Sequence, residues 1–173
     1  MRLFIAVNFP KEIKKVLEDN AGYIMKRTES GVFPLSETYH ITLAFLGETE
    51  PKRLEELKKA MDISFEPFTL TLGNFGCFRR SGGNILWRGA ESPELSELRK
   101  RLVRSLNSSR FSVDTGVFTP HITLAREAVY TGSVFPEAER ASFVVTSFEL
   151  MKSERINGRM KYTPLYSKEA KNV

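Results

Sequence analysis

The sequence predicts a fold of mixed helices and strands, built from two β-α-β-α-β halves that are related by duplication. The main observation is a repeat: the run HITLA at His40–Ala44 recurs 81 residues later at His121–Ala125, an offset of nearly half the 173-residue chain. A second observation is that the predicted elements around the two copies follow in the same order. We place the halves at about residues 1–83 and 84–173 of a single domain, because no linker or low-complexity tract separates them.

The first half begins with a strand and continues with a helix. Leu3–Asn8 is rich in β-forming residues, and Pro10 opens a segment whose apolar residues share one helical face, at Ile13, Val16, Leu17 and Ile24. The first copy of the repeat then follows as a strand. The pattern completes this half with a helix over Thr49–Ile63, a strand over Phe68–Phe78 and a loop at residues 79–84.

The second half repeats this order. A strand is expected over Asn84–Gly89, and Ser92 and Pro93 then supply an N-cap and a first-turn proline. The helix that they open carries an apolar stripe at Leu95, Leu98, Leu102 and Leu106. The second copy of the repeat lies in a strand over Thr119–Arg126.

The remaining residues predict a short helix and a hairpin. The helix is expected over Phe135–Ala141. Phe143–Glu154 and Arg159–Ser167 are typical of strands, and an Asn157-Gly158 turn joins them. These two strands extend the duplicated pattern at its C-terminal end.

Composition narrows the class of protein. Hydrophobic residues make up 41% and charged residues 27%, which is typical of a soluble globular protein and excludes a disordered or fibrous chain. The apolar runs are far shorter than the roughly 20 residues of a membrane-spanning helix. The apolar start is expected to be a strand and not a signal peptide. The net charge of +5 only weakly favours a polyanionic partner. A single cysteine, Cys77, predicts a reducing compartment, which we take to be the cytoplasm.

The repeat contains both histidines of the chain. Strand alternation places His40, Thr42 and Ala44 on one face and Ile41, Leu43 and Phe45 on the other, and the second copy repeats this pattern. If a pseudo-twofold axis relates the halves, two imidazoles and two hydroxyls face one cleft. A lone strand histidine is usually structural, but core packing gives no reason for the only two histidines to keep identical neighbours.

This set of side chains suits phosphodiester chemistry. One neutral and one charged imidazole can remove a proton from water and give another to a leaving oxygen. The hydroxyls of Thr42 and Thr123 can donate to the non-bridging phosphoryl oxygens. The histidine faces carry no Asp, Glu or Cys, whereas a catalytic zinc usually has three protein ligands. We therefore expect neither a metal nor another cofactor.

These residues carry a resemblance to a known family. The two His-x-Thr-x motifs, the start Leu3–Val7, Thr119-Pro120 before the second motif and the ending Gly158-x-x-x-Tyr162-x-x-Leu165 resemble the 2H phosphoesterase superfamily. Within that superfamily, the chain is most similar to the LigT-like RNA 2′,3′-cyclic phosphodiesterases, also described as 2′-5′ RNA ligases. The likeness covers essentially the full length.

The resemblance implies a bilobal α+β fold, in which two antiparallel sheets face a central cleft with helices outside. It implies hydrolysis of RNA 2′,3′-cyclic phosphate ends to 2′-phosphomonoesters and, in some members, the joining of tRNA halves through a 2′,5′ linkage. It makes His40 the proton donor to the departing 3′-oxygen and His121 the proton acceptor that activates water. Thr42 and Thr123 would hold the phosphate.

The role of Arg126 stays open. Strict alternation places it on the face opposite His121, toward a helix or solvent. A bulge or the end of the strand would instead turn its guanidinium toward a phosphate, whose geometry it matches.

For other aromatic and basic residues, we expect structural roles and not functional ones. Phe45 and Phe118 could stack on a base, but with 13 phenylalanines in the chain we expect them to pack in the core. The arginines of the central region could contact RNA, and we expect them to be solvated loop charges: Arg79, Arg80 and Arg88.

Two further functions remain as alternatives. The chain could be a non-catalytic module that binds RNA ends or nucleotides through their phosphates. It could also act on a small cyclic-phosphate metabolite, since the motifs do not define the substrate. We expect a monomer, because each repeat already has a partner within the chain.

Overall fold

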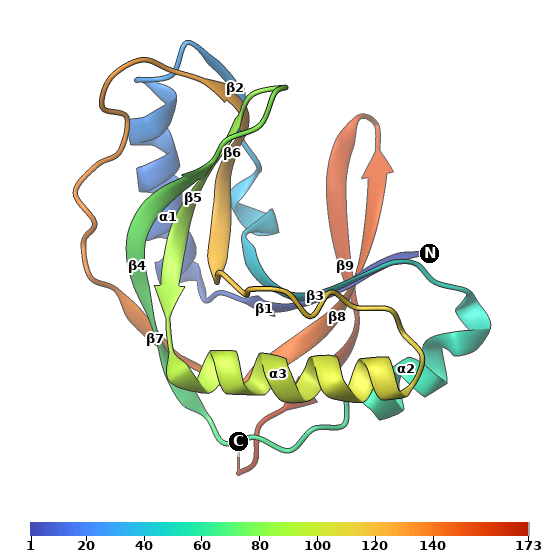
Figure 1. Cartoon of the computed structure of the whole chain (residues 1–173). Coiled ribbons are helices and arrows are strands. Elements are labelled where there is room, and N and C mark those ends of the chain that lie inside the picture. Colours follow the sequence, from blue (N-terminus) through green and yellow to red (C-terminus); the bar gives the residue numbers. More distant parts are fainter. Residues whose placement is uncertain (173) are drawn as a thin grey trace.

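The computed structural model describes residues 1–172, which contain nine strands, three α-helices and two 3₁₀ helices (Figure 1). In chain order these elements are β1 (Arg2–Asn8), α1 (Lys11–Met25), β2 (Ser30–Val32), η1 (Ser36–Thr38), β3 (His40–Glu48), η2 (Pro51–Arg53), α2 (Leu54–Ala60), β4 (Phe68–Phe78), β5 (Asn84–Glu91), α3 (Pro93–Ser108), β6 (His121–Val129), β7 (Ser142–Val145), β8 (Ser147–Ile156) and β9 (Arg159–Glu169). With nine strands and only three α-helices among these residues, the strands form the main framework of the fold.

The strands form two antiparallel sheets. The first has the order β3-β1-β8-β9 and the second has the order β2-β6-β5-β4-β7. The helices α1 and α3 lie against the outer sides of these sheets, α1 next to β6 and α3 next to β3 (Figure 1). The predicted α+β class with two antiparallel sheets is therefore confirmed.

The two sheets have the same strand order once the duplicated strands are matched. β3, β1, β8 and β9 of the first sheet correspond to β6, β5, β4 and β7 of the second, and β2 is an addition. The sheets also exchange strands: β8 and β9 follow residue 84 yet complete the first sheet, whereas β4 precedes it and completes the second. Neither half of the sequence thus forms a whole sheet from its own strands.

The repeat extends to the hydrogen-bonded register. Asn8 pairs with His40 in the first sheet, and Gly89, 81 residues later, pairs with His121 in the second. The same offset relates the pairs formed by Thr42 and Thr123 with their neighbours on β1 and β5. The duplication therefore preserves the pairing that fixes where each motif lies.

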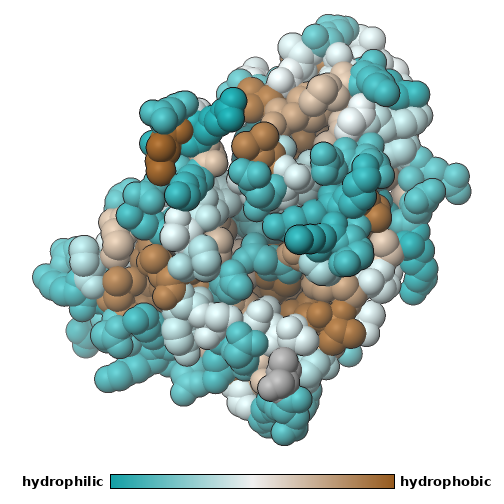
Figure 2. All heavy atoms as spheres, turned by 180° about the vertical axis from the view of Figure 1, so that it is seen from behind, coloured by the Kyte–Doolittle hydropathy of each residue, from teal (hydrophilic) through white to brown (hydrophobic). Residues whose placement is uncertain are grey.

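Both long helices pack through the stripes that the sequence predicts. α1 buries Ile13, Leu17 and Ile24, and α3 buries Leu95, Leu98, Leu102 and Leu106. The Oγ of Ser92 accepts a hydrogen bond from the backbone N–H of Leu95 at 3.2 Å, and Pro93 occupies the first turn, as expected. Among residues 1–172, no helix combines the length and the apolar character needed to cross a membrane. The surface seen from behind is largely hydrophilic, with smaller apolar areas between (Figure 2).

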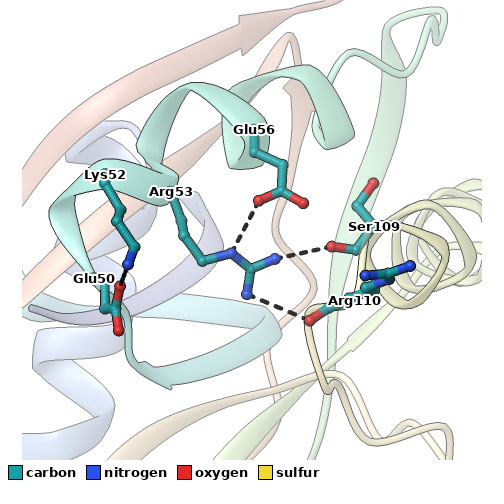
Figure 3. Close-up of polar contacts among 6 residues, drawn as sticks. All are labelled: Glu50, Lys52, Arg53, Glu56, Ser109 and Arg110. Atoms are coloured by element: carbon teal, nitrogen blue, oxygen red, sulfur yellow. Dashed lines mark hydrogen bonds and ion pairs between the residues drawn. The ribbon is translucent and has the colours of Figure 1, made fainter.

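The predicted helix over Thr49–Ile63 is shorter in the structure and starts with the 3₁₀ turn η2. Arg53, the last residue of η2, links this region to the end of α3 (Figure 3). Its guanidinium donates to the carbonyl oxygens of Ser109 at 3.0 Å and Arg110 at 3.4 Å, and its Nε pairs with Glu56 at 2.9 Å. These bonds satisfy carbonyl groups that follow the C-terminus of α3.

The helix predicted over Phe135–Ala141 is wrong. These residues form no helix, because their backbone and side chains bond to the second sheet instead. The N–H of Leu72 donates to the carbonyl of Ala141 at 2.8 Å, and the Phe135 ring stacks on Phe75 with 5.3 Å between centroids. The carbonyl of Glu139 accepts a further bond from Arg88.

Arg88 is fully buried, which corrects the prediction of a solvated loop charge. It stands on β5 at the position that matches Val7 on β1. Its guanidinium donates to the side-chain oxygen of Asn20 at 2.8 Å and to the carbonyls of Gly73 and Glu139. Burial lowers the pKa of Arg88, although an arginine remains charged in proteins. This one side chain therefore joins α1, β4, β5 and the segment before β7.

Replacing Arg88 with Ala is expected to lower the free energy of unfolding by about 3 kcal/mol, because it leaves the buried acceptors of Asn20 and Gly73 and the partly buried carbonyl of Glu139 without donors. Asn20→Ala should cost about 1–2 kcal/mol, since it leaves one donor of a buried cation unpaired. Urea unfolding followed by circular dichroism measures both. Arg104→Ala, at an exposed position of α3, is the matched control and should leave the midpoint nearly unchanged. An Arg88→Ala midpoint equal to that control would contradict the structural role of Arg88.

Candidate active site

A cleft of about 1100 Å³ lies between the two sheets. Its walls come from β1 and β3, from β6, from the β8–β9 hairpin and from the segment that leads into β3. All five residues singled out from the sequence line this one cleft: His40, Thr42, His121, Thr123 and Arg126. The structure thus brings together side chains from both copies of the repeat.

His40 is held by hydrogen bonds on both ring nitrogens. Its Nδ1 lies 2.7 Å from the carbonyl oxygen of Thr38, which can only accept, so Nδ1 carries the proton. Its Nε2 lies 3.1 Å from the Oγ1 of Thr42 and, in the neutral ring, accepts from that hydroxyl. The ring packs between Phe4 at 4.9 Å and Tyr162 at 5.2 Å, measured between centroids.

His121 repeats half of this arrangement. Its Nδ1 lies 2.7 Å from the carbonyl oxygen of Thr119, the residue that matches Thr38 in the repeat. Its ring contacts Phe78 at 5.0 Å and Trp87 at 5.9 Å. Within residues 1–172, its Nε2 has no hydrogen-bond partner. The two histidines therefore share a tautomer, with the proton on Nδ1. They differ at Nε2, which bonds to Thr42 in His40 and is free to act on a ligand in His121.

Gly76 leaves room for the Trp87 indole, which packs against the His121 ring. A Cβ at this position would lie 2.2 Å from the Trp87 indole, so any other residue would displace that ring. Trp87 in turn packs on Phe78 at 5.2 Å and contacts the imidazole. The close approach of β4 and β5 at Gly76 thus helps to orient the second histidine.

The cleft lowers the pKa of both histidines below the usual 6.5. For His40, burial is the main cause, the hydrogen bond to Thr38 opposes it, and the positive charges of Arg126 and His121 add to it. For His121, burial again leads, the Thr119 carbonyl opposes it, and Arg126 adds to it. Both free imidazoles are therefore mainly neutral at pH 7, and a bound anion would favour their protonated forms.

A β-bulge in each motif strand breaks the alternation that the sequence predicts. On β3 the pairing skips a residue between Thr42 and Ala44, and on β6 it skips one between Thr123 and Ala125. Ala44, which alternation places beside His40, is therefore buried. The residue after each alanine turns to the histidine face instead.

The duplicated bulge places Phe45 and Arg126 at matching positions in the cleft. Phe45 is 50% exposed and has the Arg2 guanidinium 5.1 Å from its ring centroid, so the expected core packing is wrong for this residue. Arg126 is exposed and lines the cleft close enough to lower the pKa of both histidines. Of the two placements left open for Arg126, the structure shows the one produced by a bulge.

The other candidates lie outside the cleft. Phe118 is partly buried against the core, as expected, with the Arg99 guanidinium 5.1 Å from its ring. Arg79 and Arg80 are exposed on the β4–β5 hairpin and do not line the cleft. Within residues 1–172, no group of three or more His, Cys, Asp or Glu side chains is arranged to hold a metal ion.

Sequence reasoning missed the aromatic side chains that hold the imidazoles. Tyr162 reaches His40 from β9, and only its place in the Gly158-x-x-x-Tyr162 pattern singled it out. Phe4 looks like an ordinary strand residue in the sequence. No local signal could have paired either residue with His40, because the contacts join strands that are distant in the chain.

Comparisons with known proteins agree with this geometry. A family model described as the 2′-5′ RNA ligase superfamily matches residues 33–157. A relative from Escherichia coli K12, named RNA 2′,3′-cyclic phosphodiesterase, is 33% identical over 168 residues, which cover 95% of this chain and 93% of the relative. A relative of the same name from Geobacillus stearothermophilus is 34% identical over 94% of this chain, and the chain spans about half of its length, 54%.

Solved structures show the same fold. The crystal structure of Escherichia coli LigT complexed with 3′-AMP has a TM-score of 0.85 and 31% identity, and the match covers 99% of this chain and 98% of LigT. The TT0787 protein of Thermus thermophilus has a TM-score of 0.85 and 26% identity, with 98% and 97% covered. With the duplicated histidine motifs, the shared fold and the family match together, the chain belongs to the 2′-5′ RNA ligase superfamily.

Proposed function

We propose that this protein hydrolyses RNA 2′,3′-cyclic phosphate ends to 2′-phosphomonoesters by acid–base catalysis with two histidines. The observation that carries the proposal is the placement of His40 and His121, each with Nδ1 on a backbone carbonyl, in one cleft lined by two threonines and an arginine. The names of the bacterial relatives support the substrate class.

In the proposed reaction, His121 acts as the base. Its Nε2 has no partner within residues 1–172, so it can accept a proton from a water molecule that attacks phosphorus. The bond between phosphorus and the 3′-oxygen breaks, and protonated His40 gives a proton to that oxygen. The products are a 2′-phosphomonoester and a 3′-hydroxyl. The assignment of acid and base follows the family resemblance and the freedom of His121 Nε2.

Other cleft residues bind the phosphate and the nucleoside. The hydroxyls of Thr42 and Thr123 donate to the non-bridging oxygens, where negative charge builds up in the transition state. Arg126 offers a guanidinium to the same group. The exposed ring of Phe45 provides a surface on which a base can stack. The negative charge of the substrate also raises the pKa of His40, which supplies the protonated acid.

The same site could also join two RNA ends. The 5′-hydroxyl of a second RNA would replace water as the nucleophile: its oxygen attacks the phosphorus of the cyclic phosphate and loses its proton to His121, the bond to the 3′-oxygen breaks, His40 protonates that oxygen, and a 2′,5′ linkage results. We extend the proposal to this 2′-5′ ligation, with tRNA halves as one class of RNA that carries such ends. We also propose a cytoplasmic monomer, consistent with the single free cysteine, Cys77.

Replacing His40 or His121 with Ala is expected to lower kcat/KM by about 10²–10⁴-fold, because each variant loses a proton-transfer group. The assay uses RNA ending in a 2′,3′-cyclic phosphate, without added metal or nucleoside triphosphate. Analysis of the product should identify a 2′-monoester. Circular dichroism and thermal unfolding serve as controls for folding.

Three results would contradict the proposed mechanism, activity or substrate. Near-normal turnover by both folded variants would exclude the two-histidine mechanism. Tight binding of the RNA end without turnover by the wild-type protein would indicate a binding module. Turnover restricted to a small cyclic-phosphate metabolite would change the substrate and keep the chemistry.

Replacing Arg126 with Gln is expected to raise the pKa of both histidines, because a positive charge that disfavours the imidazolium forms is removed. In the free wild-type enzyme, both titrations should lie below the usual 6.5, and the inflections of kcat/KM against pH should do the same. In the variant, the titrations and both inflections should move to higher pH, while kcat/KM falls.

NMR titration measures this shift directly, since the chain has only two histidines and hence two sets of imidazole signals. Arg104→Gln, at an exposed position outside the cleft, should leave both titrations unchanged. Unshifted imidazole signals in Arg126→Gln would show that the guanidinium does not act on the histidines.

A further inference from the structure

The β8–β9 hairpin projects beyond the rest of the first sheet and forms one wall of the catalytic cleft. In Figure 1 the hairpin stands alone beside the open side of the second sheet, and in Figure 2 it is the projection at the upper left, where hydrophilic and apolar side chains mix. Arg155, Gly158, Arg159 and Met160 of this hairpin line the same cleft as His40 and His121. The mechanism proposed above uses none of these four residues.

Strand register shows which hairpin side chains face the site. Ser153 pairs with Tyr162, and Arg155 pairs with Met160 two positions further out. Cross-strand partners share a face, and side chains two positions apart along a strand do so as well. Because the Tyr162 ring contacts His40, Arg155 and Met160 lie on the cleft face, about 7 Å beyond Tyr162 along the hairpin.

The turn fixes this arrangement. Asn157 and Gly158 have φ values of 50° and 78°, which matches the two positive φ angles of a type I′ turn. Such a turn follows the natural twist of the strands and joins them with two residues, as the sequence predicts. Arg155 and Met160 therefore stand on a short, regular hairpin and not on an irregular loop.

The cleft face of the hairpin combines a free cation with exposed apolar surface. Within residues 1–172, Arg155 forms no ion pair, and its hydrogen bond to the Gly158 carbonyl is long, at 3.4 Å. Met160 is 37% exposed. Glu154 also lines the cleft, but Lys152 neutralises it at 2.7 Å. A ligand with both negative charge and flat apolar groups matches this surface, as single-stranded RNA does.

We propose that the β8–β9 hairpin binds the RNA strand on the 5′ side of the reacting nucleotide, with Arg155 on a backbone phosphate and Met160 against a base. This inference rests on the proposed function. The terminal nucleotide has its 2′- and 3′-oxygens tied up in the cyclic phosphate, so the RNA continues only from its 5′-oxygen. A strand leaving the cleft past Tyr162 meets Arg155 next. The preferred substrate is then an RNA oligomer and not a cyclic mononucleotide.

The test compares two substrates with the same reacting group: adenosine 2′,3′-cyclic phosphate and a short single-stranded RNA that ends in it. The wild-type protein should have the higher kcat/KM on the oligomer. Arg155→Gln should lower kcat/KM on the oligomer by about fivefold at low ionic strength, the upper range for one exposed ion contact. It should leave hydrolysis of the mononucleotide unchanged. The slope of log(kcat/KM) against log[salt] for the oligomer should become shallower by about 0.7, the value for one phosphate contact on a single strand.

Two matched arginine variants serve as controls. Arg104→Gln lies on α3, and Arg79→Gln lies on the β4–β5 hairpin; neither residue lines the cleft. Both should behave as wild type on both substrates. Equal losses on both substrates for Arg155→Gln, no loss on the oligomer, or an equal loss for Arg79→Gln would overturn the inference.

The same experiment separates this inference from the proposed function. Failure of the wild-type protein to hydrolyse either substrate would refute the proposed function. Binding of the fluorescently labelled oligomer, followed by anisotropy, would then still test the hairpin. A fivefold weaker binding by Arg155→Gln than by Arg104→Gln would support it, and equal binding by the two variants would overturn it.

Discussion

The pairing of each motif strand with its neighbour positions both histidines, both threonines and Arg126 in the cleft. β3 pairs with β1, and β6 pairs with β5, in registers related by the same 81-residue offset and interrupted by the same bulge. A shift by one residue would turn each histidine to the opposite face of its sheet. The buried aliphatic residues between the polar ones oppose such a shift, because it would expose them. Core packing and the placement of the two histidines are thus one constraint.

The exchange of strands makes the two lobes depend on each other. The first sheet is completed by β8 and β9, and the second by β4. This exchange also brings Tyr162 onto the ring of His40, so that a residue from the second half of the chain supports a histidine from the first. The cleft therefore lies between two lobes that each contain strands from both halves of the sequence. This exchange fixes the positions of the cleft walls relative to one another.

The sequence alone predicts features that follow from local periodicity and fails where distant contacts decide. The repeat and the alternation place both histidines and both threonines correctly in one cleft. Alternation misplaces Phe45 because a bulge adds a residue without a local sequence signal. Arg88 looks like a loop charge in the sequence, but it is buried and donates hydrogen bonds to an asparagine of α1 and to two carbonyls. Phe135–Ala141 has helical periodicity, but its backbone groups bond to the second sheet instead.

The order of strands in the first sheet has a consequence for synthesis on the ribosome. β1 precedes the other strands in the chain, yet one of its edges pairs with β8, where Leu3 lies opposite Lys152. Until that late segment emerges from the exit tunnel, β1 and β3 form a two-stranded ribbon with an unpaired apolar edge, which is open to association with other chains. The first lobe consequently closes only after β8 has been synthesised. Until then, this edge favours aggregation unless another chain segment or a chaperone covers it.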